Sequence, residues 1–205
     1  MPELAETPAR RRGRPRIPKE VQHGRLLNGA AIAFREHGYD RTRVADIVAA
    51  AGMSSRSFYE FFDSKEDLVA SVVSVAGKAV VARFQEILAE TEDPVERIDR
   101  GLQLFLDLFS QLPVDLESLG GAAGREVRSA RRDYVREAIQ LVLGELSVAH
   151  EKGVIPSKPN HVFVELVLTG VEGMAFRYHS EGRQSELRDL HPVIRDLLVR
   201  VLLGD

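Results

Sequence analysis

The sequence predicts an all-α protein of about nine helices. Apolar residues recur at spacings of three and four along most of the chain after residue 18, which is the period of a helix with one buried face. No segment shows the sustained alternation of apolar and polar residues that is typical of a half-buried strand. Glycines and prolines interrupt the periodic segments, and they indicate where the helices end.

Short-range signals bound the first two expected helices. The first covers residues 19–37, and Gly38 supplies the left-handed position that ends it. The second covers residues 43–50, and Thr42 before it has the side-chain chemistry of an N-cap.

The later helices are marked in the same way. Ser64 and Asp67 resemble a capping box, and Asp93 followed by Pro94 is an N-cap with proline in the first helical position. Helices with an apolar face are expected over about 68–90, 94–112, 125–152, 160–181 and 192–203, with a short helix or loop over 113–124.

The composition bounds the class of protein. The chain has 205 residues, of which 44% are hydrophobic and 29% charged, as in soluble globular proteins. It has no cysteine, so disulfides and thiolate chemistry are excluded. The first 30 residues lack the apolar core of a signal peptide, and the longest apolar stretch, 69–82, is too short and too interrupted to span a bilayer. We therefore expect a cytoplasmic protein with no membrane contact.

Two of the short helices form a helix-turn-helix pattern. The helix over 43–50 is followed by a tight turn around Gly52 and by a helix over 54–62 that Ser54 can cap. In such a motif the second helix buries one face and presents hydrogen-bonding groups to a DNA major groove with the other. The buried face here is Met53, Phe58 and Phe62, and the outer face is Ser55, Arg56, Ser57 and Tyr59.

Four motifs within residues 30–73 carry a resemblance to a known family. They are F-x-x-x-G-Y-x-x-T, V-x-D-I-x-x-x-A-G-M-S, F-Y-x-x-F and S-K-E-D-L. Together they resemble the DNA-binding domain of the TetR family of bacterial regulators. The resemblance implies a transcriptional regulator, typically a repressor, that binds palindromic operator DNA as a homodimer and is released by a small-molecule effector.

The resemblance also implies roles for single residues. Phosphate contacts are implied for Thr42, Tyr59 and Lys65, and base contacts for Ser55, Arg56 and Ser57. Arg56 has the geometry to fork onto a guanine. Arg43 is added because it lies at a helix start, where free amides receive phosphates. Glu60 departs from the family, which often has histidine there, and we expect it to face solvent or to pair with an arginine.

The rear helices correspond to the ligand-binding and dimerisation domain that the resemblance implies. An apolar pocket is expected among the helices over 68–90, 94–112, 125–152 and 160–181. For each candidate residue an ordinary core position is the alternative, because helical spacing does not distinguish the two. Glu165 can meet a cationic or hydroxylated ligand or pair with an arginine. The candidates are Phe84, Phe105, Phe109, Tyr134, Phe163, Glu165, Met174 and Tyr178.

The two C-terminal helices suggest a homodimer interface. Small residues on the helix over 160–181 permit close helix approach, and the last helix has an apolar stripe. Such a pair can form a four-helix bundle with its symmetry mate. The candidates are Gly170, Gly173, Ile194, Leu197, Leu198 and Val201.

The charge of the chain is unevenly distributed. Residues 1–65 hold 12 Lys and Arg against 8 Asp and Glu, whereas the whole chain has a net charge of -3. The sequence RGRP at 12–15 resembles an AT-hook, in which Arg12 and Arg14 would enter the narrow minor groove of A·T-rich DNA. The alternative is a solvated tail that adds only nonspecific attraction.

The expected organisation is a flexible basic arm (1–18), a DNA-binding domain (19–66) and a ligand-binding and dimerisation domain (67–205). The partners are double-stranded DNA, a small-molecule effector and a second copy of the chain, with no metal and no cofactor. An architectural protein that coats A·T-rich DNA without an effector is the alternative function. An enzyme is disfavoured, because no two of the 6 histidines are four residues apart and no common catalytic motif occurs.

Overall fold

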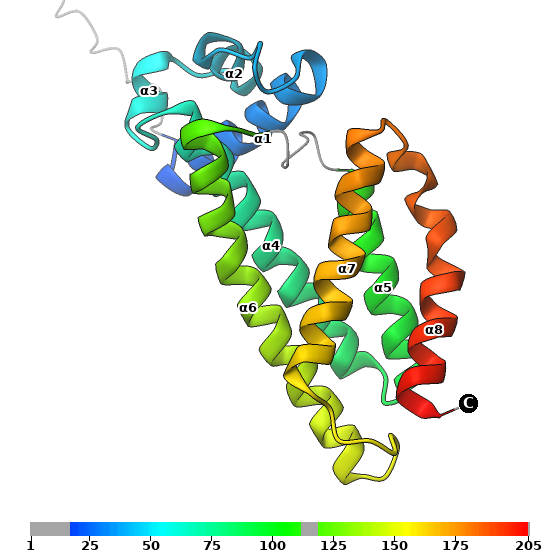
Figure 1. The fold of residues 1–205 in the computed structure, drawn as a ribbon. Helices are drawn as coiled ribbons and strands as arrows, with labels where there is room; N and C mark the ends of the chain where they lie inside the picture. The colour runs from blue at the N-terminus through cyan, green and yellow to red at the C-terminus, as the bar shows by residue number, and fades with distance from the viewer. Residues whose placement is uncertain (1–16, 112–118, 205) are drawn as a thin grey trace, which may run out of the picture.

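The structure is a computed structural model that describes residues 17–111 and 119–204. These two ranges contain eight α-helices and one 3-10 helix. In Figure 1, α1, α2 and α3 lie together at one end of the molecule, and the long helices α4 and α6 run side by side away from them. The elements are α1 (Lys19–His37), α2 (Val44–Ala51), α3 (Ser55–Tyr59), α4 (Lys65–Glu90), α5 (Pro94–Ser110), α6 (Gly121–Glu151), α7 (His161–Ser180), the 3-10 helix η1 (Gln184–Leu190) and α8 (His191–Leu203).

Side-chain caps start four of these helices. Ser54 accepts the Ser57 amide at 3.1 Å, and Ser64 accepts the Asp67 amide at 3.1 Å, as the sequence predicts. Asp93 caps α5 in front of its N-terminal proline, and Asn160 caps α7. Each cap satisfies an amide that has no partner within its own helix, and this local chemistry is why the helices begin where they do.

Two of the expected local signals are wrong in detail. The N-cap of α2 is Arg43, and the preceding Thr42 is buried with its hydroxyl turned toward α1. Gly38 ends α1 with a positive φ of 75°, but its ψ of 160° is far from the left-handed helical conformation. Gly52, with φ 63° and ψ 38°, adopts that conformation after α2.

A single core unites the front of the molecule with the start of α6. Phe34 of α1, Ile47 of α2 and Phe58 of α3 are almost fully buried in it, together with the first turns of α4. This core also contains Leu119, Ala123 and Val127, which come later in the sequence. The beginning of α6 is therefore part of the packing that holds the helix-turn-helix.

The rear helices are joined by a second set of contacts. Leu102 and Leu106 of α5 pack against Val171 of α7 and Ile194 of α8. Near the end of α5, Phe109 packs edge-on against Phe176 of α7, with Leu187 of η1 beside them. Helix α5 is thus covered by α7, η1 and α8. None of the described helices is both long and apolar enough to cross a membrane.

Candidate functional sites: the recognition helix and an apolar cavity

Helix α3 presents a short polar surface. Phe58 is fully buried and fixes the helix from below, while Ser55, Arg56 and Tyr59 lie on the exposed side. The Arg56 side chain is 92% exposed, and it faces Glu60 one turn later at 3.8 Å. Glu60 therefore pairs with an arginine, as expected from its departure from the family pattern. The pair is long and solvated, so it holds Arg56 only weakly.

The remaining predicted base contact, Ser57, is half-buried and already bonded. Its hydroxyl lies 2.9 Å from that of Ser54, and its amide donates to the same Ser54 oxygen. These bonds hold the first turn of α3 together, so the backbone of the predicted recognition helix is ordered by its own side chains.

Thr42 and Lys65, for which the resemblance implies phosphate contacts, form hydrogen bonds within the protein instead. The Thr42 hydroxyl donates to the carbonyl oxygens of Gly38 at 2.7 Å and Ala33 at 3.2 Å. The Lys65 ammonium donates to the carbonyls of Tyr39 at 2.8 Å and Thr42 at 2.9 Å. It also lies 4.1 Å from the centre of the Tyr39 ring. Both side chains thereby tie the loop between α1 and α2 to its neighbours.

Arg43 lies at the start of α2 with an exposed side chain. Its backbone amide donates to Asp46 at 2.8 Å, and this hydrogen bond holds the pKa of the Asp46 carboxyl below its ordinary value. The Asp46 carboxylate thus already accepts a hydrogen bond from one backbone amide at the start of α2. The positive group that faces solvent here is the Arg43 guanidinium. Arg12 and Arg14 of the predicted minor-groove arm lie outside the described residues.

A cavity of about 220 Å³ lies among α4, α5, α6 and α7, with the end of α8 at its edge. Its lining is almost entirely aliphatic and aromatic. The structure brings five of the predicted pocket residues to it, namely Phe84, Phe105, Phe109, Tyr134 and Phe163. Glycine makes room for two of these rings, because a β-carbon on Gly77 would meet Tyr134 and one on Gly101 would meet Phe84.

Three predicted pocket residues lie elsewhere. Glu165 is on the surface of α7 beside His161, at 3.6 Å. Met174 packs beside the contacts between α5 and α8, and Tyr178 packs near η1 under the guanidinium of Arg183. These expectations were wrong because helical periodicity tells that a residue faces inward but not which neighbours it meets there.

Glu172, which was not predicted, is a buried acidic residue of the cavity lining, with an exposed fraction of 2%. Arg131 of α6 binds both of its carboxylate oxygens, through Nε at 2.6 Å and through a second, short contact from Nη2. The Tyr134 hydroxyl lies 3.4 Å from the same carboxylate. Burial, reinforced by the negative charge of Glu172, raises the pKa of Tyr134 well above its ordinary range. This hydroxyl therefore keeps its proton.

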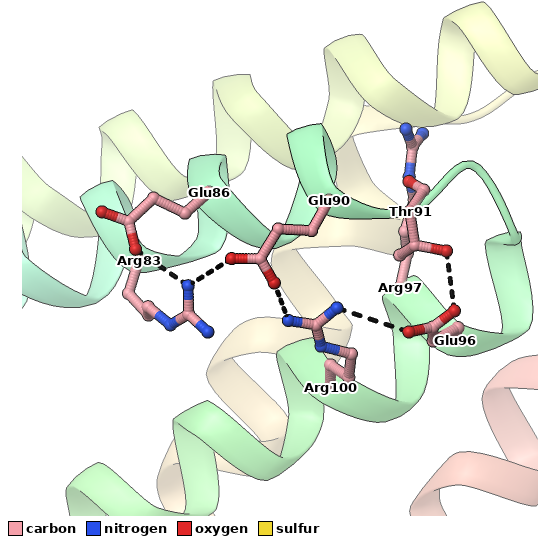
Figure 2. A network of polar contacts seen from close by, with 7 residues as sticks. All are labelled: Arg83, Glu86, Glu90, Thr91, Glu96, Arg97 and Arg100. Atoms are coloured by element: carbon pink, nitrogen blue, oxygen red, sulfur yellow. Dashed lines mark hydrogen bonds and ion pairs between the residues drawn. The ribbon is translucent and has the colours of Figure 1, made fainter.

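A second ion pair borders the cavity where α4 turns into α5. Arg97 donates to Glu145 of α6 at 3.1 Å and to the backbone carbonyls of Leu88 and Thr91. Figure 2 shows the chain of contacts around this turn, in which one acidic residue of α4, Glu90, joins Arg83 to Arg100. The network fixes the α4–α5 corner and so holds Arg97 at the cavity.

Comparison with known proteins supports the assignment of the front helices. Residues 26–72 match the sequence model described as bacterial regulatory proteins, tetR family. This segment of the chain is therefore similar to the bacterial regulatory proteins of the tetR family. One relative is the HTH-type transcriptional repressor KstR2 of Mycobacterium tuberculosis, with 38% identity over 77 residues, which is 38% of each chain. Another is the transcriptional activator FasR of Mycolicibacterium smegmatis, with 31% identity over 99 residues, 48% of this chain and 45% of FasR. The matched segment therefore covers less than half of these relatives.

The similarity to TetR-type structures extends beyond the front helices to most of the chain. A TetR transcription regulator from Haloarcula marismortui superposes with a TM-score of 0.73 at 18% identity, over 86% of this chain and 96% of that one. FadR of Bacillus subtilis, solved with stearoyl-CoA, superposes with a TM-score of 0.70 at 16% identity, over 86% and 97% of the two chains. The relatives and neighbours named here are transcription regulators and not enzymes.

In this TetR-type structure, α7 and α8 leave an apolar face exposed. On α7 it contains Val162 and Leu166, the latter 67% exposed, followed by the open glycines Gly170 and Gly173. On α8 it contains Val193, Leu197 and Val201, with Leu197 60% exposed. Both helices pack on α5 through their opposite sides, so these residues point away from the body of the protomer.

The structure corrects two predicted interface residues. Ile194 is buried within the protomer against α5 and α7, and Leu198 packs beside it and lines the cavity. The outward residues of α8 are Val193, which was not predicted, and the predicted Leu197 and Val201. Val162 and Leu166 were not predicted, although their spacing of four is the signal of one helix face.

Proposed function

We propose that the protein is a homodimeric transcriptional repressor that binds palindromic operator DNA and is released by a small-molecule effector in the cavity between α4 and α7. The TetR-family domain and the exposed polar face of α3 support the DNA-binding half of this proposal. Arg56 is the base-reading residue, and Arg43 and Tyr59 contact the phosphates beside it.

The observation that carries the effector half is that two helices run from the cavity into the core of the DNA-binding domain. Gly77 and Tyr134 meet at the cavity, while Leu68 of α4 and Val127 of α6 are buried in the core that holds α1 to α3. Val127 and Tyr134 are separated by about 10 Å along the helix axis. A ligand that displaces Tyr134 therefore moves elements on which the recognition helix rests.

The exposed face of α7 and α8 supplies the dimer in this proposal. Pairing it with its symmetry mate makes a four-helix bundle and covers the apolar side chains of Val162, Leu166, Val193 and Leu197. In a dimer the two copies of α3 must match two half-sites about one helical turn of DNA, or a multiple of it, apart. An effector that favours a different spacing releases the operator by shifting the population of conformers.

The cavity favours a regulator over an architectural protein. An architectural DNA-binding protein needs no internal ligand site, whereas here an aliphatic and aromatic cavity lies among four helices. FadR of Bacillus subtilis, whose structure contains stearoyl-CoA, shares this fold, which supports a ligand site in the rear helices. A regulator binds its operator about 10³–10⁷ times more tightly than random DNA, and an architectural protein shows a far smaller ratio.

We propose further that the N-terminal arm adds a minor-groove contact through Arg12 and Arg14. The sequence RGRP supports this role, because the glycine allows close approach and the proline extends the preceding arginine. The arm precedes α1, so it can follow the DNA past the edge of the α3 contact.

The test is a salt titration of binding to the DNA upstream of the protein's own gene, with random DNA as the reference. The full chain is compared with a chain that lacks residues 1–17. We expect the full chain to prefer the upstream DNA, and we expect truncation to lower the salt slope by about two and to remove a preference for A·T-rich flanks. An equal loss on all DNA would make the arm a simple polycation. If the full chain preferred no DNA fragment over random DNA, this result would contradict the proposed regulator function.

A further inference from the structure

We infer that the ligand of this cavity, if the cavity is the effector site proposed above, is an uncharged, mainly hydrocarbon molecule with a single oxygen that accepts a hydrogen bond from Tyr134. Three features of the lining lead to this class of ligand. They are the apolar walls, the complete pairing of the charges and the position of one protonated hydroxyl.

The walls select for hydrocarbon. Among the described residues that line the cavity, the polar side chains are Arg97, Tyr134, Glu145 and Glu172, and all others are apolar. Rings of Phe84, Phe105 and Phe163 contribute much of this surface. An alkyl or alicyclic group gains from leaving water at such a surface, whereas a second polar group would lose its hydration without finding a partner.

The charges in the lining are already compensated. Glu172 is bound through both carboxylate oxygens by Arg131, and Arg97 is paired with Glu145. A carboxylate ligand would have to displace Glu172 or Glu145 from its arginine, and an ammonium ligand would have to displace an arginine from its carboxylate. At Glu172 this exchange leaves a buried carboxylate without its partner, which is strongly unfavourable, whereas the Arg97–Glu145 pair is partly exposed and the cost there is smaller. An uncharged ligand avoids this cost.

Tyr134 supplies the one directional contact. Its hydroxyl lies 3.4 Å from Glu172 Oε1, which is long for an O–H···O hydrogen bond, and the same oxygen accepts a hydrogen bond from Arg131 Nε at 2.6 Å. The hydroxyl keeps its proton, as its raised pKa requires. It is therefore a donor at the cavity wall that can turn to a hydroxyl or carbonyl oxygen of the ligand.

The test compares three ligands that share one chain length and differ in charge. Decanol, decanoate and decylammonium are titrated into the full-length dimer by calorimetry near neutral pH. The carboxyl and ammonium groups titrate about three units below and above neutral pH, so each ion must be neutralised before it enters. We expect decanol to bind about a thousandfold more tightly than either ion, and decanoate to gain about tenfold for each unit by which the pH is lowered.

A pair of variants tests the hydrogen bond. Tyr134→Phe keeps the ring over Gly77 but removes the donor, and it should weaken decanol binding about three- to tenfold. Tyr178→Phe is the matched control, because Tyr178 lies outside the cavity lining and should leave decanol binding unchanged. Circular dichroism of both variants verifies that they are folded.

The outcomes separate the ligand class from the function. Equal or tighter binding of decanoate or decylammonium, or no binding of decanol, would overturn the inferred ligand class. Release of labelled operator DNA is measured in the same titrations. If decanoate binds at least as tightly as decanol and releases the DNA, the effector mechanism stands and the ligand class is wrong. If decanol binds without releasing the DNA, the ligand class stands and the effector mechanism is wrong.

Discussion

The ring of Tyr134 lies directly against the backbone of Gly77, so that a β-carbon on Gly77 would approach the ring to 2.3 Å. Real β-carbons do not come this close to another atom. The contact joins α6 to α4 at the wall of the cavity. Glycine at position 77 is therefore required by a neighbouring side chain and not by an unusual backbone angle.

Gly77→Ala should overpack this contact. We expect the free energy of unfolding to fall by about 1–3 kcal/mol, because the Tyr134 ring and the two helices must move apart. The measurement is chemical denaturation of the full chain. Gly144→Ala on α6 is the control, since no atom lies within 4 Å of its β-carbon position, and it should be stabilising by about 1 kcal/mol. Equal effects of the two substitutions would contradict the packing argument.

Leu197→Glu should convert the proposed dimer to monomers. It places a charge in the centre of the exposed face of α7 and α8, where burial against a second copy would leave that charge unpaired. Light scattering measures the mass, and operator affinity should fall with it. Val75→Glu is the control, because Val75 is also an exposed apolar residue but lies on α4, away from this face. A Leu197→Glu protein that stays dimeric would exclude this interface.

Arg56→Ala should relax DNA specificity at one base pair of each half-site, at a cost of about 1–3 kcal/mol on the preferred operator. Arg43→Ala should instead weaken binding about equally on every sequence and reduce the salt slope by about one. Competition binding on operators with single substitutions distinguishes these results. Uniform weakening by Arg56→Ala would mean that Arg56 contacts the DNA backbone.

Lys65→Met should lower the stability of the protein as well as its DNA affinity. The Lys65 ammonium donates to two backbone carbonyls of the loop between α1 and α2, and methionine leaves both without it. We expect a loss of about 1–3 kcal/mol in the free energy of unfolding. Lys78→Met, at an exposed position of the same helix, should change it by less than about 0.5 kcal/mol. A Lys65→Met protein of unchanged stability with weaker DNA binding would restore the original phosphate role.

Sequence reasoning succeeded where the controlling interactions are local. The start of α4 follows from Ser64 and the start of α5 from Asp93 and Pro94, because each cap bonds an amide two or three residues away. Helix α1 likewise begins and ends where its pattern predicts. Such signals are present in any short window of the chain.

Sequence reasoning failed where contacts between residues that are distant in the sequence determine the structure. The last helix is apolar on two faces, and only its packing on α5 shows that Ile194 is inward and Leu197 outward. Arg131 of α6 binds Glu172 of α7, 41 residues away, and no local pattern around either residue indicates this pairing. Thr42 has the chemistry of a cap, but burial against α1 directs its hydroxyl elsewhere.

The packing of Leu119, Ala123 and Val127 against the helix-turn-helix limits how this protein can be divided. A fragment that stops at the end of α4 would leave part of its own hydrophobic core open to water. A chimera that transfers the front helices to another regulator must therefore carry the first two turns of α6 as well. The front helices and the start of α6 therefore form one packing unit, although Leu68 and Leu119 are more than fifty positions apart along the chain.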